Sequence, residues 1–238
     1  MNYKIIKKEL KRFSNKDKAH TLQYFFKTGK GQYGEGDVFI GVTSPEMQQI
    51  AKKYYETISL AEVKQLLYSK IHEERLTALF LLVYKYQKIK SPKEKKEVCE
   101  FYLKNLKQVN NWDLVDISCY KIVGDYLYNH VKNKKILYKL AESKNMWEQR
   151  VSIVSTMYFV RKNDLKDTIK LSEMLLNHKH DLMHKAVGWL LREVGKKDEK
   201  LLKKFLKKHY DDIPRTTLRY SIERMEEKER KKYLKKDF

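Results

Sequence analysis

Hydrophobic residues recur at helical spacing along almost the whole chain. Between Leu76 and Tyr86, for example, the apolar side chains fall on one broad face of a helix. No segment alternates convincingly with the period of two that marks a strand, and residues 38–42 are the only short candidate. The pattern therefore predicts an all-α protein.

Capping signals divide this pattern into separate helices. Ser44-Pro45 and Ser91-Pro92 each place an N-cap hydroxyl before a proline, which is tolerated at the first helical position. Asn110-Asn111 offers another N-cap. The two longest predicted spans, 111–130 and 214–234, each leave room for a break. We predict helices over residues 3–14, 17–28, 45–57, 59–68, 71–88, 92–107, 111–130, 134–142, 146–161, 165–176, 180–195, 197–208 and 214–234.

The predicted helix pairs follow one another about every 35 to 45 residues, which is the period of HEAT-like repeats. We therefore predict a single domain, residues 1–238, in which a HEAT-like helical repeat array forms a curved α-solenoid with a concave basic face. Such a face can line a long ligand such as duplex DNA. Because the repeats resemble one another only weakly, an irregular helical domain is the alternative.

The composition supports this architecture. Of the 238 residues, 42% are hydrophobic, which is enough for one large core or a short repeat array. The chain has only 8 glycines and 3 prolines, whereas sheets with many tight turns need more of both. Cys99 and Cys119 lie in apolar helical patterns, and we expect them to be reduced core thiols.

The charge narrows the class of partner. The chain has 52 basic and 31 acidic residues and a net charge of +21, and such an excess repels itself unless a polyanion is nearby. Nucleic acid is the leading partner, and a lysine-rich proteome that adds charge to every surface is the alternative. The N-terminus lacks an apolar signal core, and no run of about 18 apolar residues could span a membrane. We expect a cytoplasmic protein that contacts no membrane.

Two motif matches have plainer interpretations. Gly29 to Gly34 fits the glycine pattern of dinucleotide sites, but it follows a helix without a surrounding βαβ unit, so we favour a flexible loop that reaches toward DNA. His178, His180 and His184 could suggest a metal site, but they lie at the junction of a loop and a helix, so we favour a solvated surface. We expect neither a metal nor a cofactor.

Each of the three tryptophans has a charged residue one helical turn onward, on the same helix face. Aromatic and charged side chains on one surface suit contact with sugars and phosphates, whereas a tryptophan in the core is the plainer alternative. We prefer the core for the second tryptophan and leave the other two open. The pairs are Trp112 with Asp116, Trp147 with Arg150, and Trp189 with Arg192.

Two carboxylates follow Trp112. Asp113 lies near the helix start, where an acid favours the helix dipole. Asp116 comes later and is flanked by core residues, and burying part of a carboxylate is costly unless something pairs with it or uses it. Asp116 is therefore harder to explain as a purely structural charge, although spacing alone does not decide between the two.

With these residues in view, the chain resembles the AlkD-like DNA alkylation repair glycosylases, which are built from HEAT-like repeats. The match runs in order from about residue 20 to residue 195, and the C-terminal part matches only as helices. Each segment is weak alone, and together they are specific. The segments are Gln23–Lys27 (QYFFK), Phe39–Glu46 (FIGVTSPE), Asn111–Asp116 (NWDLVD), Met146–Arg150 (MWEQR) and Lys185–Glu193 (KAVGWLLRE).

The resemblance implies hydrolysis of the N-glycosidic bond of cationic alkylated purines, notably N7-methylguanine and N3-methyladenine, in duplex DNA. It implies that Asp116 is the catalytic carboxylate and that Trp112 and Trp189 pack against the deoxyribose of the lesion. Tyr24 and Arg150 match other residues that line this site. The family holds the deoxyribose while the lesion stays stacked, so the resemblance also implies catalysis without base flipping.

One departure from the family pattern follows Pro45. Met47 and Gln48 stand where relatives often place basic residues, which leaves phosphate contacts there unsupported. Other basic residues lie on the helix that carries the third tryptophan or at its exit. These candidate DNA contacts are Lys185, Arg192, Lys196 and Lys197.

A carboxylate suits this chemistry because loss of the purine leaves an oxocarbenium-like sugar, positive at C1′. The departing base is already cationic and leaves neutral, so a strong general acid is unnecessary. Two alternatives stay open: a non-catalytic DNA-binding paralogue, which loss of Asp116 or Trp112 would have favoured, and a protein-interaction scaffold, which the charge of +21 disfavours. We expect a monomer that binds double-stranded DNA.

Overall fold

The computed structural model describes residues 2–132 and 134–237, and every regular element in this part of the chain is helical. The all-α prediction is therefore confirmed. The candidate strand at residues 38–42 is an irregular segment, of which Val38 alone makes an isolated bridge, to Ile71.

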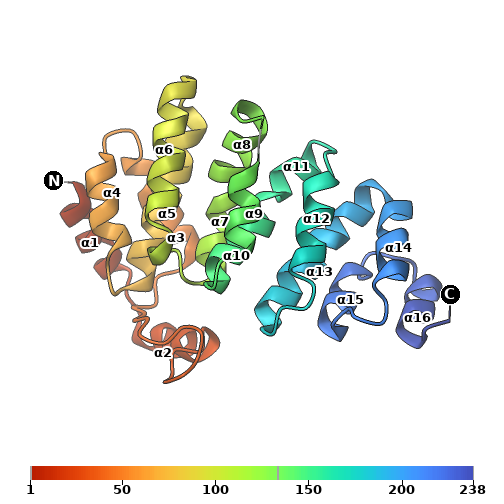
Figure 1. The fold of residues 1–238 in the computed structure, drawn as a ribbon. Coiled ribbons are helices and arrows are strands. Elements are labelled where there is room, and N and C mark those ends of the chain that lie inside the picture. The colour runs from red at the N-terminus through yellow and green to blue at the C-terminus, as the bar shows by residue number, and fades with distance from the viewer. Residues whose placement is uncertain (1, 133, 238) are drawn as a thin grey trace. The chain divides into compact units, whose positions relative to one another are not determined.

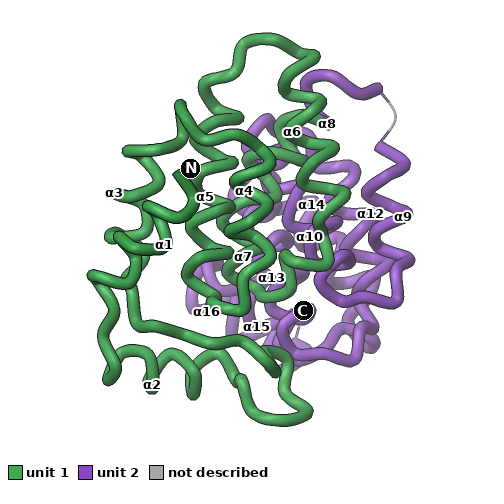
Figure 2. The backbone as a smooth tube through the Cα atoms, turned by 90° about the vertical axis from the view of Figure 1, so that its left-hand side faces the viewer, with its two compact units in different colours: residues 1–126 green, residues 127–238 purple. Residues whose placement is uncertain are grey.

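Contacts between Cα atoms divide the chain into two compact units, residues 1–126 and 127–238. Figure 2 draws the two units in different colours. The single domain and the concave basic face stay predictions. Among the helices of the described residues, none has both the length and the apolar character needed to cross a bilayer.

Unit 1 holds the first half of the helices, and the last of them continues past its boundary (Figure 1). Its elements are α1 (Asn2–Arg12), α2 (Lys16–Phe25), α3 (Ser44–Tyr54), α4 (Leu60–Leu67), α5 (His72–Lys88), α6 (Pro92–Lys104), the 3-10 turn η1 (Leu106–Gln108), α7 (Trp112–Cys119), the π-helical turn η2 (Tyr120–Gly124) and α8 (Asp125–His130).

Unit 2 continues with helices of similar length (Figure 1). Its elements are α9 (Lys135–Ala141), α10 (Met146–Ser155), α11 (Met157–Arg161), α12 (Lys166–Met174), α13 (Asp181–Lys197), α14 (Glu199–Lys208), α15 (Arg215–Ser221) and α16 (Glu227–Lys235).

Some helix ends differ from the sequence prediction. The span 17–28 was too long, because α2 stops before Lys27, whose φ of 55° is left-handed. The span 146–161 is interrupted at Thr156, whose hydroxyl donates back to the Ile153 carbonyl at 2.7 Å. The break that the prediction allowed in the span 214–234 is present, between α15 and α16.

The predicted caps are confirmed at two of three positions. The side chains of Ser91 and Asn111 cap α6 and α7 as expected. At α3 the cap is Thr43 rather than Ser44, because Glu46 accepts hydrogen bonds from both the amide and the hydroxyl of Thr43 at 2.7 Å. This capping box shifts the helix start by one residue.

Helix α5 is the centre of unit 1 and packs against α1, α3, α4, α6 and α7. Its residues are buried almost without interruption from His72 to Val83, including four polar residues in the first turn. The free thiols of Cys99 and Cys119 are also buried here, as expected. A helix hydrophobic on all sides belongs in the middle of a core, and α5 occupies that place.

Helix α2 is fastened to unit 1 at its two ends rather than along its length, and none of its residues is buried. In Figure 1 it lies apart from α3, α4 and α5. At its start, the amide of Asn15 donates to the Ile40 carbonyl at 2.9 Å. Gly41 makes this approach possible, since a Cβ there would lie 2.0 Å from the carbonyl oxygen of Asn15.

Helix α13 is the centre of unit 2 and packs against α10, α12, α14 and α15. At Gly188 it approaches α15 so closely that a Cβ would lie 2.6 Å from the Cβ of Tyr220 and 2.7 Å from the carbonyl oxygen of Thr217.

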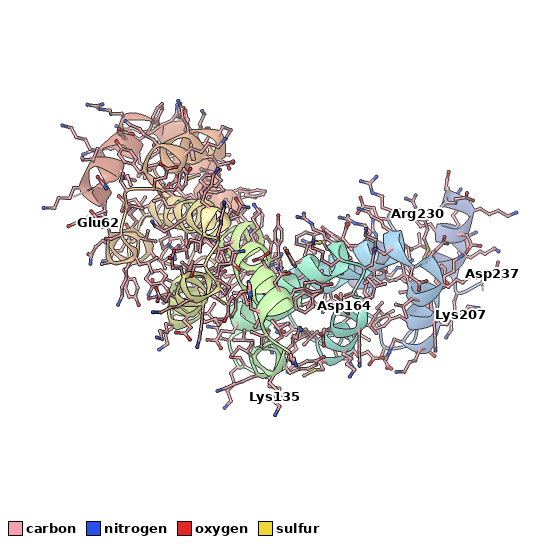
Figure 3. The ribbon with its side chains drawn as sticks, turned by 90° about the horizontal axis from the view of Figure 1, so that it is seen from above. Glu62, Lys135, Asp164, Lys207, Arg230 and Asp237 are labelled. Atoms are coloured by element: carbon pink, nitrogen blue, oxygen red, sulfur yellow. The ribbon has the colours of Figure 1, made fainter. Side chains whose placement is uncertain are left out.

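The excess of lysine side chains lies on the surface of the protein. Lys135 and Lys207 are among the exposed ones (Figure 3).

We predict that Gly188→Ala destabilises the protein although alanine is the better helix former. The new methyl group collides with backbone and Cβ atoms of α15, and overpacking of this kind costs about 1–3 kcal/mol. The matched control is Gly195→Ala on the same helix, where the Cβ meets only the side chain of Leu202. Urea unfolding should show a difference of about 2 kcal/mol between the variants, and equal stabilities would contradict the prediction.

Candidate functional site

Trp112 and Asp116 lie on α7, one helical turn apart on the same face. The helix begins at Trp112 because the side chain of Asn111 accepts a hydrogen bond from the Trp112 amide at 2.8 Å. Both functional candidates are partly exposed, whereas Leu114 and Val115 between them are buried. The helix therefore presents an indole and a carboxylate from a firmly packed base.

The indole of Trp112 is the first ring of an aromatic stack. It stacks on Phe26 with 5.2 Å between ring centroids, and Phe26 stacks on Phe39 at 4.9 Å. Phe39 in turn stacks on the imidazole of His72 at 4.5 Å, and Phe25 meets Trp112 edge to face at 6.1 Å. A partly exposed tryptophan held by this many ring contacts has little freedom to rotate.

A buried polar network lies at the far end of this stack. The Nδ1 atom of His72 is 2.9 Å from a carboxylate oxygen of Asp37, and its Nε2 atom is 2.8 Å from one of Asp113. Arg75 pairs with Asp37 from the other side and also donates to the side chain of Asn110. All three charged partners of this cluster are buried with His72, whose exposed fraction is 1%.

The charges of this network shift the pKa of its members. Burial disfavours the charged imidazolium, but the carboxylates of Asp113 and Asp37 outweigh burial and raise the pKa of His72 to about 9. Burial alone would raise the pKa of Asp37, but the hydrogen bond from His72 and the charge of Arg75 hold it below its usual value. The folded state thus keeps the cations of His72 and Arg75 and the carboxylates of Asp37 and Asp113 together out of water.

A second buried carboxylate, Glu73, fastens the segment before α3. Its oxygens accept the backbone amides of Ile40 at 3.0 Å and Gly41 at 2.8 Å. Burial raises the pKa of Glu73 despite these hydrogen bonds. The start of α5 therefore holds both α7, through His72, and the loop that reaches α3, through Glu73.

A pocket of about 590 Å³ adjoins the indole of Trp112. Apolar side chains from α2, α3, α5 and the loop between α2 and α3 form most of its wall. His72 and Asp113 also line it, at the edge of the buried network. The apolar lining residues include Leu22, Phe26, Phe39, Met47, Phe80 and Ile117.

Tyr24, the remaining site candidate of unit 1, lies on the open side of α2. Its side chain is 79% exposed, and the Nζ atom of Lys27 lies 5.5 Å from its ring centroid. His20 and Gln23 line a shallow hollow beside it. Tyr24 is thus available for a contact with a large ligand, next to a basic side chain.

In unit 2, Lys185, Trp189 and Arg192 lie on consecutive turns of α13 and are all partly exposed. Lys185 pairs with Asp181 at 2.8 Å. Arg192 pairs with Glu193 at 3.2 Å and also with Glu223. These two candidate DNA contacts therefore have carboxylate partners within the chain.

Trp147 and Arg150, which form one of the three predicted pairs, are both buried. Trp147 is 8% exposed, which confirms that it belongs to the core. Arg150 is only 5% exposed and donates to the Leu182 carbonyl in the first turn of α13 at 2.5 Å. It braces the start of the helix that carries Trp189.

The glycine-rich segment and the histidine cluster noted in the sequence form a loop and a helix cap. The segment from Gly29 to Gly34 follows α2 as an irregular loop. The ring of His180 caps α13 by accepting the Leu182 amide at 3.1 Å, and that of His178 accepts the His180 amide at 2.9 Å. Within the described residues no group of three metal-ligating side chains converges.

Sequence reasoning missed the network around His72 and ranked the two carboxylates of α7 by a criterion that the structure does not support. Asp113, at 9% exposure, is more buried than Asp116, and it pairs with His72. The segment His72 to Arg75 resembles an exposed first turn because four polar residues follow one another. No periodicity in the sequence distinguishes it from a solvated helix start.

Comparison with known proteins places these features in a family. A sequence model of the family described as DNA alkylation repair enzyme matches residues 6–225. No curated protein sequence matches the chain significantly.

Two solved structures share the fold. One is a protein from Enterococcus faecalis described as a predicted DNA alkylation repair enzyme, with 18% identity, a TM-score of 0.70, and coverage of 90% of this chain and 97% of that one. The other is AlkD2 from Streptococcus mutans, with 17% identity, a TM-score of 0.57, and coverage of 89% and 99%. At these identities the likeness concerns the fold, which is that of AlkD-type helical-repeat proteins.

The raised pKa of His72 predicts a pH-dependent stability. Its contribution is complete below the unfolded pKa of 6.5 and is lost as the pH rises through the folded value of about 9. Replacing it in His72→Asn should therefore cost more at pH 6 than at pH 9.5, by on the order of 3 kcal/mol. Urea unfolding at both values measures this, with His130→Asn at an exposed site as the control. A cost independent of pH would refute the assignment.

Proposed function

Because this chain belongs to the DNA alkylation repair enzyme family, we propose that it is a monofunctional DNA glycosylase that hydrolyses the N-glycosidic bond of cationic alkylated purines in duplex DNA. N7-methylguanine and N3-methyladenine are the proposed substrates. The observation that carries this proposal is the pair Trp112 and Asp116, in which a firmly stacked indole stands one helical turn from a partly exposed carboxylate.

The proposed role of Asp116 is electrostatic. As the bond from C1′ to the purine nitrogen breaks, its electron pair neutralises the cationic base and the sugar becomes oxocarbenium-like. At about 4 Å and an effective dielectric near 20, a carboxylate attracts this charge by about 4 kcal/mol, worth roughly a thousandfold in rate. Water then attacks C1′ and releases one proton, which the carboxylate can accept.

Trp112 and Trp189 are proposed to hold the deoxyribose. The face of an indole carries negative potential, so it can support a cationic sugar by the physics of cation–π contacts. The rings of Phe25 and Phe26 support this role for Trp112, because an indole already fixed by packing loses little entropy when a ligand arrives. Following the family resemblance, we propose that the base stays stacked in the duplex while the sugar is held, so that catalysis proceeds without base flipping.

No enzyme acid is needed in this scheme, because the departing base leaves as a neutral molecule. His72 contacts α7 through Asp113, but it is not placed to protonate a base. Both of its ring nitrogens already face carboxylates, and its exposed fraction is 1%. Its burial supports a mechanism that relies on charge stabilisation rather than on protonation of the base.

The proposed DNA contacts are Tyr24, Arg150, Lys185 and Arg192. Phosphates would take the places that Asp181 and Glu223 occupy as partners of the two α13 cations. The role of Arg150, which is buried and bonded to the Leu182 carbonyl, is proposed from the family resemblance alone. We propose that the protein acts on double-stranded DNA as a monomer, without a metal or another cofactor.

We predict that Asp116→Asn loses excision activity and keeps its affinity for DNA. Removing the charge should slow the reaction by about 100-fold or more, since carboxylate stabilisation carries most of the barrier reduction in this scheme. The assay incubates the protein with duplex that contains N7-methylguanine, cleaves abasic sites with alkali and measures strand breaks. Asp212→Asn, the same change at an exposed carboxyl, is the control.

The same assay separates the alternatives. Wild-type protein that binds the duplex and yields no strand breaks would be a non-catalytic DNA-binding paralogue, and failure to bind would point to a protein-interaction scaffold. Full activity in Asp116→Asn would show that another group stabilises the sugar.

The proposal also predicts a narrow lesion range. If selectivity comes from the lability of a cationic purine, neutral lesions should be poor substrates, because no residue protonates the leaving base. Duplexes that contain uracil or 1,N6-ethenoadenine should therefore release no base at enzyme levels that clear N7-methylguanine. Efficient excision of uracil by the pure protein would contradict the charge-stabilisation mechanism.

A further inference from the structure

His72, in the first turn of α5, is connected to the residues on either side of Trp112 in the chain, Asn111 and Asp113. On one side, Nε2 of His72 meets Asp113 at 2.8 Å, and the other oxygen of Asp113 accepts the Leu114 amide at 2.8 Å. This pair of contacts ties the first turn of α7 to α5.

The second connection runs through Asp37. Its carboxylate meets Nδ1 of His72 at 2.9 Å and accepts the side-chain amide of Asn111 at 3.2 Å. Asn111 is fully buried and caps α7 by accepting the Trp112 amide at 2.8 Å. The residue before Trp112 is thus held by the same imidazole that holds the residue after it.

The third connection is the ring stack, which runs from His72 through Phe39 and Phe26 to the face of the Trp112 indole. The backbone at both sides of Trp112 and one face of its side chain therefore depend on a single buried ring.

The geometry requires both ring nitrogens of His72 to donate, because each one faces a carboxylate. A neutral imidazole has one N–H and would leave either Asp37 or Asp113 with a lone pair facing it. The charged groups that face His72 are these two carboxylates, the like charge of Arg75 with Nη2 at 3.4 Å from Nδ1, and the neighbouring Glu73. Loss of the proton leaves an unbalanced buried carboxylate.

We propose that His72 is a positioning residue of the glycosylase site: as a buried cation between Asp37 and Asp113, it fixes the start of α7 and with it the indole of Trp112. This inference rests on the proposed function. Because its exposed fraction is only 1%, the ring is not placed to touch DNA or the reacting bond, and it acts through the orientation of Trp112 and, along the helix, of Asp116. When the proton leaves, the first turn of α7 loosens and excision slows.

The first experiment needs no activity. In wild-type protein labelled with 15N, both ring nitrogens of His72 should be protonated at neutral pH and titrate near pH 9. The indole N–H resonance of Trp112 should move with the same midpoint. Spectra of His72→Gln and Trp112→Phe assign the two signals. Titration of His72 near pH 6.5, or a Trp112 signal that ignores it, would overturn the proposal.

The second experiment measures single-turnover excision of N7-methylguanine from pH 6 to pH 9.5, at saturating protein, in wild type and in two variants. The amide nitrogen of His72→Gln stands near Nε2 and can still donate to Asp113, whereas that of His72→Asn stands near Nδ1 and reaches only Asp37. His72→Gln should therefore retain more activity than His72→Asn, which should lose about tenfold or more at pH 7 with little change in DNA affinity.

The ratio of wild-type to His72→Gln rates removes any titration of the substrate itself. It should fall about fourfold between pH 7 and pH 9.5, as the wild type loses the His72 proton and comes to resemble the variant. A ratio that stays constant over this range would overturn the proposal. His130→Asn, at an exposed histidine, should follow the wild type throughout.

The two experiments separate the two proposals. If wild-type protein excises nothing at any pH while Trp112 follows the titration of His72, the glycosylase function fails and the coupling of His72 to Trp112 stands. If excision occurs and depends on Asp116 but neither signal nor rate follows His72, the function stands and the positioning role fails. If the variants do not fold, the two signals are assigned in the wild type by through-bond correlation of each side chain with its backbone, and the wild-type titration decides.

Discussion

The contact of one imidazolium with two carboxylates organises unit 1. His72 lies at the start of α5, the helix against which α1, α3, α4, α6 and α7 pack. Breaking such a buried ion cluster by removing one member costs several kcal/mol, because the charges left behind remain out of water. The core of the unit and the geometry of its exposed indole therefore share one set of interactions, and neither can be altered alone.

Much of this architecture could be predicted from the sequence because it depends on local signals. Apolar spacing set the helices, and Asn111 and Ser91 marked two helix starts through their own side chains. The break at Thr156 and the cap at Thr43 were missed, since each depends on whether a hydroxyl bonds to its neighbours in the folded chain. Signals of this kind appear in many sequences without being used.

In the candidate site, too, some features could be predicted from local signals and others depend on the folded chain. Spacing placed Trp112 and Asp116 on one face, and family resemblance gave Asp116 its role, which stays a proposal. The partners of His72 come from positions 35 and 41 residues away, and such pairings leave no trace in local periodicity. Four consecutive polar residues are all buried in α5 because other segments supply their partners, which are backbone amides for Glu73 and charged side chains for the other three. Tertiary pairing of charges is the part that a single sequence conceals.

Helix α2 has a different relation to the core. It is secured by Asn15 at one end and by the stacked ring of Phe26 just past the other, and buries none of its own residues. Exposed side chains of this helix, such as that of Tyr24 near its end, can therefore be replaced at small cost to folding. Substitutions at such positions can accumulate while the stability of the protein stays nearly constant. Helix α2 thus gives unit 1 a surface that can diverge between related proteins without a change in the core.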